Sequence, residues 1–121
     1  MQGRKWIGVA ALLGFVAVAA GAFGAHGFTT SGNAHAAGLV ETGARYQMWH
    51  ALAMLAYLGH GFPDRLPLQA WAAGAVLFPC SLYALALGAP AAFALVTPIG
   101  GLCLLLGWAA LAWSALRAPP G

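Results

Sequence analysis

Charged side chains are scarce in this chain. Asp, Glu, Lys and Arg make up 6% of its 121 residues, and none occurs between Lys5 and Glu41 or between Arg65 and Arg117. A water-soluble domain of this length needs far more charge to cover its surface. Together with a hydrophobic content of 62%, this shortage excludes an ordinary soluble domain and predicts a protein whose solvent is lipid.

Other shortages exclude further classes. The two cysteines, Cys80 and Cys103, lie in apolar runs and form no CxxC pair, so no disulfide framework is predicted. The five basic residues form no patch with aromatic side chains between them, which argues against nucleic acid as a partner. No phosphate-binding loop and no pair of nucleophile and base is visible. We therefore expect that the chain is not an enzyme.

Four apolar runs are present, separated by turn residues. A membrane-spanning helix needs about 20 residues, and the runs predict spans at about residues 6–25, 44–60, 68–87 and 91–116 of one domain, 1–121. Residues 26–38 are expected to form a polar loop between the first two spans. The fold class predicted is therefore an all-α integral membrane four-helix bundle.

Two prolines fall within the later spans. Pro79 is expected to kink the third span, because a proline inside a helix removes a backbone hydrogen bond. For the fourth span two interpretations stay open. The helix begins near Ala91 and kinks at Pro98, or Thr97 is the N-cap and Pro98 the first helical residue.

The basic residues predict the orientation. An even number of spans puts both termini on one side, and basic residues favour the cytoplasmic side. With both termini inside, Arg4, Lys5, Arg65 and Arg117 face the cytoplasm and only Arg45 lies outside. The prediction is N-in/C-in.

Small residues recur at intervals of four along the first span, at Ala10 and Gly14 and at Ala17, Gly21 and Ala25. This spacing lets a neighbouring helix approach closely in lipid. The predicted helix-packing residues are Gly14, Gly21, Gly24, Gly100 and Gly101.

A candidate polar cluster lies near the predicted outer side of the first two spans, formed by His26, Arg45, Tyr46, Gln47 and His50. Polar residues within a membrane are a functional hypothesis by default. They can fasten two helices by hydrogen bonds, line a pocket for protons or solutes, or place two histidines at a metal or haem. No metal-ligand spacing is present, so no metal and no cofactor is assigned.

Several segments together resemble one family. They are residues 21–27 (GAFGAHG), 42–52 (TGARYQMWHAL), 81–83 (SLY), 97–101 (TPIGG) and 107–108 (GW). Their order and spacing resemble the YgdD-like family of small bacterial inner-membrane proteins, a domain of unknown function. The resemblance implies four transmembrane helices, a multi-pass location in the bacterial inner (plasma) membrane and no established activity. Pro79 and Cys80 stand where that family is expected to have Ser and Gly.

The favoured hypothesis is a non-enzymatic scaffold or accessory subunit, whose small-residue faces dock in a larger membrane complex or in a homo-oligomer within the lipid bilayer. One alternative is a small transport or channel component, with a His/Tyr pocket that opens to the outer side. A further alternative is a haem- or metal-binding redox accessory.

Overall fold

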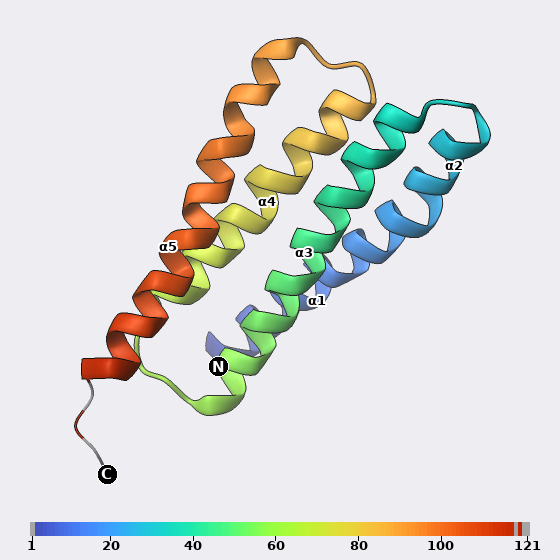
Figure 1. The fold of residues 1–121 in the computed structure, drawn as a ribbon. Coiled ribbons are helices and arrows are strands. Elements are labelled where there is room, and N and C mark those ends of the chain that lie inside the picture. The colour runs from blue at the N-terminus through green and yellow to red at the C-terminus, as the bar shows by residue number, and fades with distance from the viewer. Residues whose placement is uncertain (1, 118, 120–121) are drawn as a thin grey trace.

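The structure, a computed structural model, describes residues 2–117 and 119, which form helices with no strand among them (Figure 1). The first helical rod joins α1 (Gln2–Ala19), the π-helical turn η1 (Ala20–Gly24) and α2 (Ala25–Thr30). Then come α3 (Ala34–His60) and α4 (Leu66–Ala86). The last rod joins the 3-10 turn η2 (Ala91–Leu95) to α5 (Val96–Arg117). The all-α prediction is confirmed.

The helices pack in a row. α3 packs against α1 on one side and α4 on the other, and α4 packs in turn against α5 (Figure 1). α1 and α5 therefore lie at the two ends of the row. Both termini and the α3–α4 connection lie at one end of the molecule (Figure 1).

The helices differ in polarity. The stretches long and apolar enough to cross a membrane are Gly3–Thr30, Leu66–Ala86 and Ala91–Arg117. α3 has 27 residues, about 40 Å of helix, but its polar residues keep it out of this set. Two of these, Gln47 and His50, are buried against the protein. The span predicted at 44–60 lies inside α3 and stays a prediction.

The expected loop over 26–38 was wrong. The helix continues to Thr30, and α3 begins at Ala34. Only the short connection 31–33 separates them. Gly32 there has φ = 82°, a conformation that favours glycine. The Asn33 side chain then accepts a hydrogen bond from the N–H of Ala36 at 3.0 Å, which caps α3.

The start of the last rod combines the two open interpretations. The helical stretch does begin at Ala91, but as a 3-10 turn, and the α-helix begins at Val96. Pro98 lies in the first turn of α5, where its missing N–H removes no helical hydrogen bond. Thr97 does not act as the N-cap, because it lies inside α5 and its hydroxyl pairs with Ser81 on α4.

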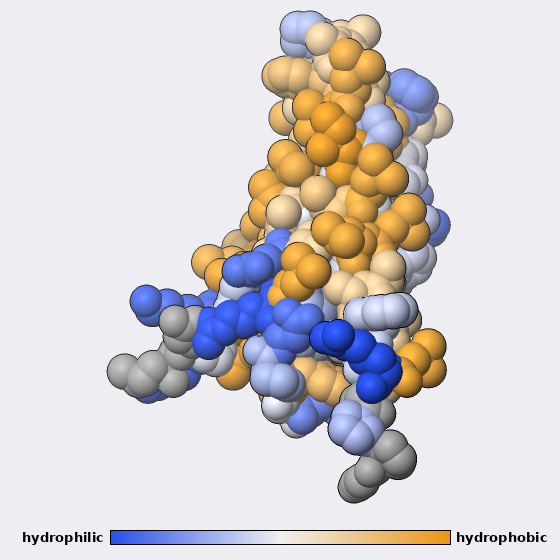
Figure 2. Space-filling model, turned by 90° about the vertical axis from the view of Figure 1, so that its left-hand side faces the viewer, coloured by the Kyte–Doolittle hydropathy of each residue, from blue (hydrophilic) through white to orange (hydrophobic). Residues whose placement is uncertain are grey.

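The core gathers residues from all the long helices. Its buried members include Ala10, Leu13, Met54, Trp71, Ala75 and Leu104. Most large apolar side chains of α1 and α5 point outward instead. Figure 2 shows one such apolar face, with hydrophilic residues gathered at the end where the termini lie. An apolar flank with polar ends is the surface expected of a protein embedded in a bilayer.

Candidate functional site

Gln47 of α3 compensates for the proline in α4. Pro79 has no N–H, so the carbonyl of Ala75, four residues earlier, lacks its helical partner. The side-chain Nε2 of Gln47 donates to that carbonyl oxygen at 3.1 Å. The Tyr83 hydroxyl donates to Gln47 Oε1 at 2.9 Å. Gln47 is only 1% exposed, and these bonds explain how its amide is tolerated inside the protein.

His50 joins α3 to α5. Its Nδ1 lies 2.7 Å from the carbonyl oxygen of Tyr46, and Trp108 Nε1 donates to its Nε2 at 3.0 Å. An indole N–H can only donate, so Nε2 is the acceptor and Nδ1 carries the proton given to Tyr46. Both ring nitrogens are therefore engaged within the protein, and the imidazole serves as a brace.

A third polar contact joins α4 to the last rod. Ser81 Oγ lies 2.8 Å from the carbonyl oxygen of Phe78 and 2.6 Å from Thr97 Oγ1. Since Ser81 has one hydroxyl proton and gives it to the carbonyl, Thr97 donates to Ser81. The three contacts brace α3, α4 and α5 against one another.

The predicted cluster is only partly brought together. Tyr46, Gln47 and His50 are near each other on α3, but Arg45 points outward and pairs with Glu41 at 3.1 Å. His26 is exposed on α2. The first helical rod and α3 run antiparallel, with Gly24 of η1 beside Val40 and Gly14 of α1 beside Met48. This register places His26 near the start of α3, several turns from His50.

The sequence analysis did not assign several members of the observed polar network to the cluster. These are Ser81, Tyr83, Thr97 and Trp108. Pro79 was the available signal, because a proline inside a buried helix implies a carbonyl that needs a donor. Which residue supplies that donor depends on how α3 and α4 are aligned.

A furrow runs between α3 and α5 over α4. Its volume is about 880 Å³, and the residues that define it include Tyr46, Trp49, Phe78, Pro98, Gly101 and Trp108. Leu102 and Leu105 also line it, each 65% exposed. Because the polar atoms of His50 and Trp108 bond to each other, the furrow is an apolar site with aromatic walls. It suits a hydrophobic occupant.

The predicted packing glycines lie at contacts within the chain. A methyl group added at Gly14, Gly21 or Gly24 would meet α3, and one at Gly100 would meet the backbone of α4 at Phe78. Gly101, in contrast, lines the furrow and has only the Phe78 ring near it.

Within residues 2–117 and 119, no three His, Cys, Asp or Glu side chains come together. Cys80 and Cys103 are separate thiols. Of the candidate histidines, His50 already uses both ring nitrogens in hydrogen bonds.

Comparison with known proteins identifies the family. The family model described as "Protein of unknown function (DUF423)" matches residues 20–101. The UPF0382 membrane protein of Haemophilus influenzae is 41% identical, over 94% of this chain and 95% of its own. The UPF0382 inner membrane protein YgdD of Escherichia coli K12 is 40% identical, over 97% and 93%. A UPF0382 membrane protein of Staphylococcus aureus is 34% identical, over 87% and 89%. No solved structure matches the chain.

The chain therefore belongs to this family of membrane proteins of unknown function, and the resemblance to YgdD-like proteins is confirmed. It is a multi-pass protein of the bacterial inner membrane.

Proposed function

We propose that the protein is a non-enzymatic accessory subunit or scaffold, and that its furrow seats a transmembrane helix of a larger membrane complex. In this proposal all four helical rods cross the membrane as a bundle, N-in/C-in. The packing of α3 between α1 and α4 supports a fourth span, because a helix held between two spanning neighbours shares their depth. The basic residues Arg4, Lys5, Arg65 and Arg117, gathered toward the end with the termini, support the orientation.

The furrow is the observation that carries the docking role. A second helix approaches closely where small residues flank a concave surface, and the furrow is lined by Gly101 as well as by the aromatic side chains of Trp49 and Trp108. The polar network beneath it holds the walls in place before a partner arrives. A preformed site loses less conformational entropy on binding.

The same network supports a role without catalysis. Three buried polar side chains, Gln47, His50 and Ser81, have hydrogen-bond partners inside the protein, whereas the indole nitrogen of the buried Trp71 has none among the described residues. Groups held in this way serve to align helices, and none of them is paired as nucleophile and base.

The proposal is tested by asking whether variants of the furrow still co-purify with a partner chain. Gly101→Leu fills the furrow, and its new Cβ would have only Phe78 Cδ2 near it, at 3.8 Å. Gly8→Leu is the matched control, because it adds the same side chain to an exposed position of α1 with nothing within 4 Å. Native mass spectrometry of protein extracted in mild detergent should show a partner chain with the native protein and with Gly8→Leu, but not with Gly101→Leu. Retention of that partner by folded Gly101→Leu would refute furrow docking. An added mass equal to this chain would identify a homo-oligomer instead.

A transport or channel component is the second candidate, because Tyr46 and His50 both line the furrow. It requires water at His50. A cysteine placed there should react with a membrane-impermeant thiol reagent from the outer side, after Cys80 and Cys103 have been replaced by serine. Full protection would remove this candidate. The redox alternative has less support, since a haem or metal would have to displace Trp108 or Tyr46 from His50.

A further inference from the structure

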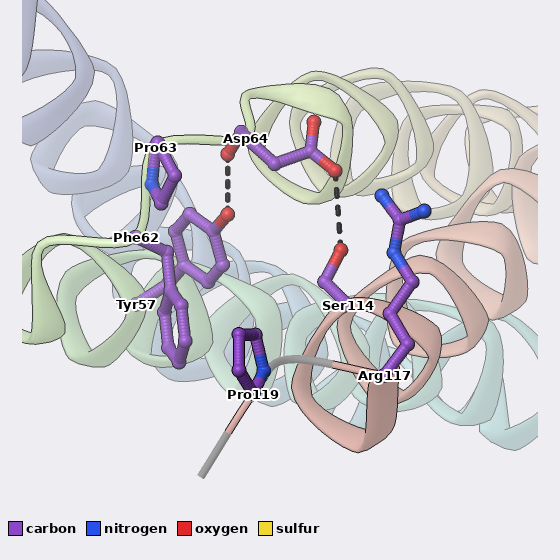
Figure 3. Close-up of a pocket in the computed structure, with 7 residues that line it drawn as sticks. All are labelled: Tyr57, Phe62, Pro63, Asp64, Ser114, Arg117 and Pro119. Atoms are coloured by element: carbon purple, nitrogen blue, oxygen red, sulfur yellow. Dashed lines mark hydrogen bonds between the residues drawn. The ribbon is translucent and has the colours of Figure 1, made fainter. Parts of the chain in front are cut away.

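A second concavity lies at the end of the molecule that carries the termini. This hollow has a volume of about 750 Å³ and lies between the α3–α4 connection and the last turn of α5 (Figure 3). It is lined by Tyr57, Phe62, Pro63, Asp64, Ser114, Arg117 and Pro119. None of these residues lines the furrow, so the hollow is a separate site.

The connection carrying Asp64 is held in place from three sides. The Tyr57 hydroxyl donates to the Asp64 carbonyl oxygen. The Asp64 carboxylate accepts from the Leu66 N–H through Oδ1 at 3.0 Å and from the Ser114 hydroxyl through Oδ2 at 3.3 Å. A carboxylate has lone pairs for about four hydrogen bonds. The carboxylate is therefore positioned, with capacity to accept more donors.

Arg117 brings the opposite charge to the same hollow. Its guanidinium carbon lies 6.0 Å from the centre of the Trp113 ring, a contact that leaves the N–H donors available. In the part of the chain that the structure describes, the ion pair present is Arg45–Glu41. Asp64 and Arg117 thus line one hollow without a direct ion-pair contact between them.

Apolar groups form the other wall. The rings of Tyr57 and Phe62 stack with centres 5.1 Å apart. Figure 3 shows these rings and the two prolines on one side, and Ser114 and Arg117 on the other. Trp113, mostly exposed on the preceding turn, is a residue typical of the membrane–water interface. A ligand that fits has a positive and a negative charge a few atoms apart, joined to an apolar body.

We propose that the hollow binds the headgroup of a phospholipid carrying both a primary ammonium and a phosphate, as in phosphatidylethanolamine. The ammonium lies against Asp64 and the phosphate against Arg117, a residue type suited to phosphate. The carboxylate disfavours a purely anionic headgroup, and a choline headgroup has no N–H to donate to it. This proposal does not depend on partner docking in the furrow.

Lipid binding to purified protein tests it. Delipidated protein is titrated, by native mass spectrometry, with phosphatidylethanolamine, phosphatidylglycerol and phosphatidylcholine bearing identical acyl chains. We expect at least fivefold tighter binding of phosphatidylethanolamine than of the other two. Soluble phosphoethanolamine, which has the same charges and no acyl chain, should bind at least tenfold more weakly; binding as tight as the lipid would overturn the assignment to a lipid.

Substitutions at Asp64 and Arg117 test which part of the headgroup each of the two charges binds. Asp64→Asn keeps an oxygen that accepts from the Leu66 N–H, and its new NH2 group can donate to the Ser114 hydroxyl. The variant removes the charge and should abolish the preference over phosphatidylcholine. Arg117→Gln, at an exposed position in the last turn of α5, should weaken phosphatidylethanolamine at least fivefold. Arg45→Gln is the control, because Arg45 lies near the middle of α3, pairs with Glu41 and does not line the hollow, and it should change nothing. Equal binding of the three lipids by the native protein, or a preference that survives both Asp64→Asn and Arg117→Gln, would overturn the proposal.

Discussion

The contact of the first helical rod, through α1 and η1, with α3 and the contact between α4 and α5 both use glycine, but at different separations. A Cβ added at Gly14 or Gly21 would lie 3.8 or 3.5 Å from the nearest atom of α3, which is ordinary contact. At the other contact, a Cβ at Gly74 would lie 2.6 Å from Leu104 Cδ2, and one at Gly100 would lie 2.7 Å from Phe78 Cα. Glycine is therefore required between α4 and α5. The contact of the first helical rod with α3 has room for a methyl group at Gly14 and Gly21.

The difference shows which part of the molecule is rigid. α4 and α5 touch nearly backbone to backbone and are also joined by the Ser81–Thr97 hydrogen bond, so they form a fixed unit. The α1–α3 contact has small side chains and no side-chain hydrogen bond among the described residues. The furrow and the hollow both include residues of α5, and they therefore rest on the fixed side of the protein.

Among the glycine substitutions at the two contacts, Gly100→Ala should lower the free energy of unfolding most. The new methyl group would meet backbone atoms of Leu77 and Phe78, which cannot rotate away. Overpacking of this kind costs about 1–3 kcal/mol, and we expect a loss near the upper end. The free energy of unfolding is measured by SDS titration in mixed micelles. Gly101→Ala is the control, since its nearest neighbour is 3.8 Å away, and it should change stability little. Equal losses at both positions would contradict the close α4–α5 contact.

Replacing Gln47 by Leu tests how α3 is attached to the fixed unit. The variant leaves the carbonyl of Ala75 without a donor and the hydroxyl of Tyr83 without an acceptor. Interhelical hydrogen bonds in membranes are worth about 0.6–1.7 kcal/mol each, so we expect a loss of about 1–2 kcal/mol in the same titration.

A double-mutant cycle with Pro79→Ala shows whether Gln47 stabilises the protein because Pro79 leaves the Ala75 carbonyl without a helical donor. Alanine restores the N–H that the Ala75 carbonyl lacks, so Gln47→Leu should cost less in the Pro79→Ala background, with a coupling of about 1 kcal/mol. Additive effects would mean that Gln47 stabilises α3 independently of the proline.

Sequence was enough for the helical class, the family and most of the helix positions, because apolar runs and the motifs in 21–27 and 42–52 are local signals. It was not enough for the partner of Gln47. That pair is 28 residues apart and depends on the alignment of two helices. His26 was grouped with His50 because both were expected near the outer side of the first two spans, and only the alignment of the first helical rod with α3 shows that they lie several turns apart. The sequence gives no reason to treat Gly100 and Gly101 differently. Only the packing shows that Gly100, and not Gly101, lies against the backbone of α4.

Gly21→Ala should have the smallest effect. Its Cβ would rest 3.5 Å from Ala44 Cβ, and an alanine in a helix gains up to about 1 kcal/mol over glycine. We therefore expect stability unchanged within about 0.5 kcal/mol, or slightly raised. Gly24→Ala, where Val40 Cγ1 would be at 3.3 Å, should be slightly less favourable because Val40 must shift. A clear destabilisation by Gly21→Ala, measured beside Gly100→Ala, would mean that α1 lies as close to α3 as α5 does to α4, and that the loose contact is in fact another tight one.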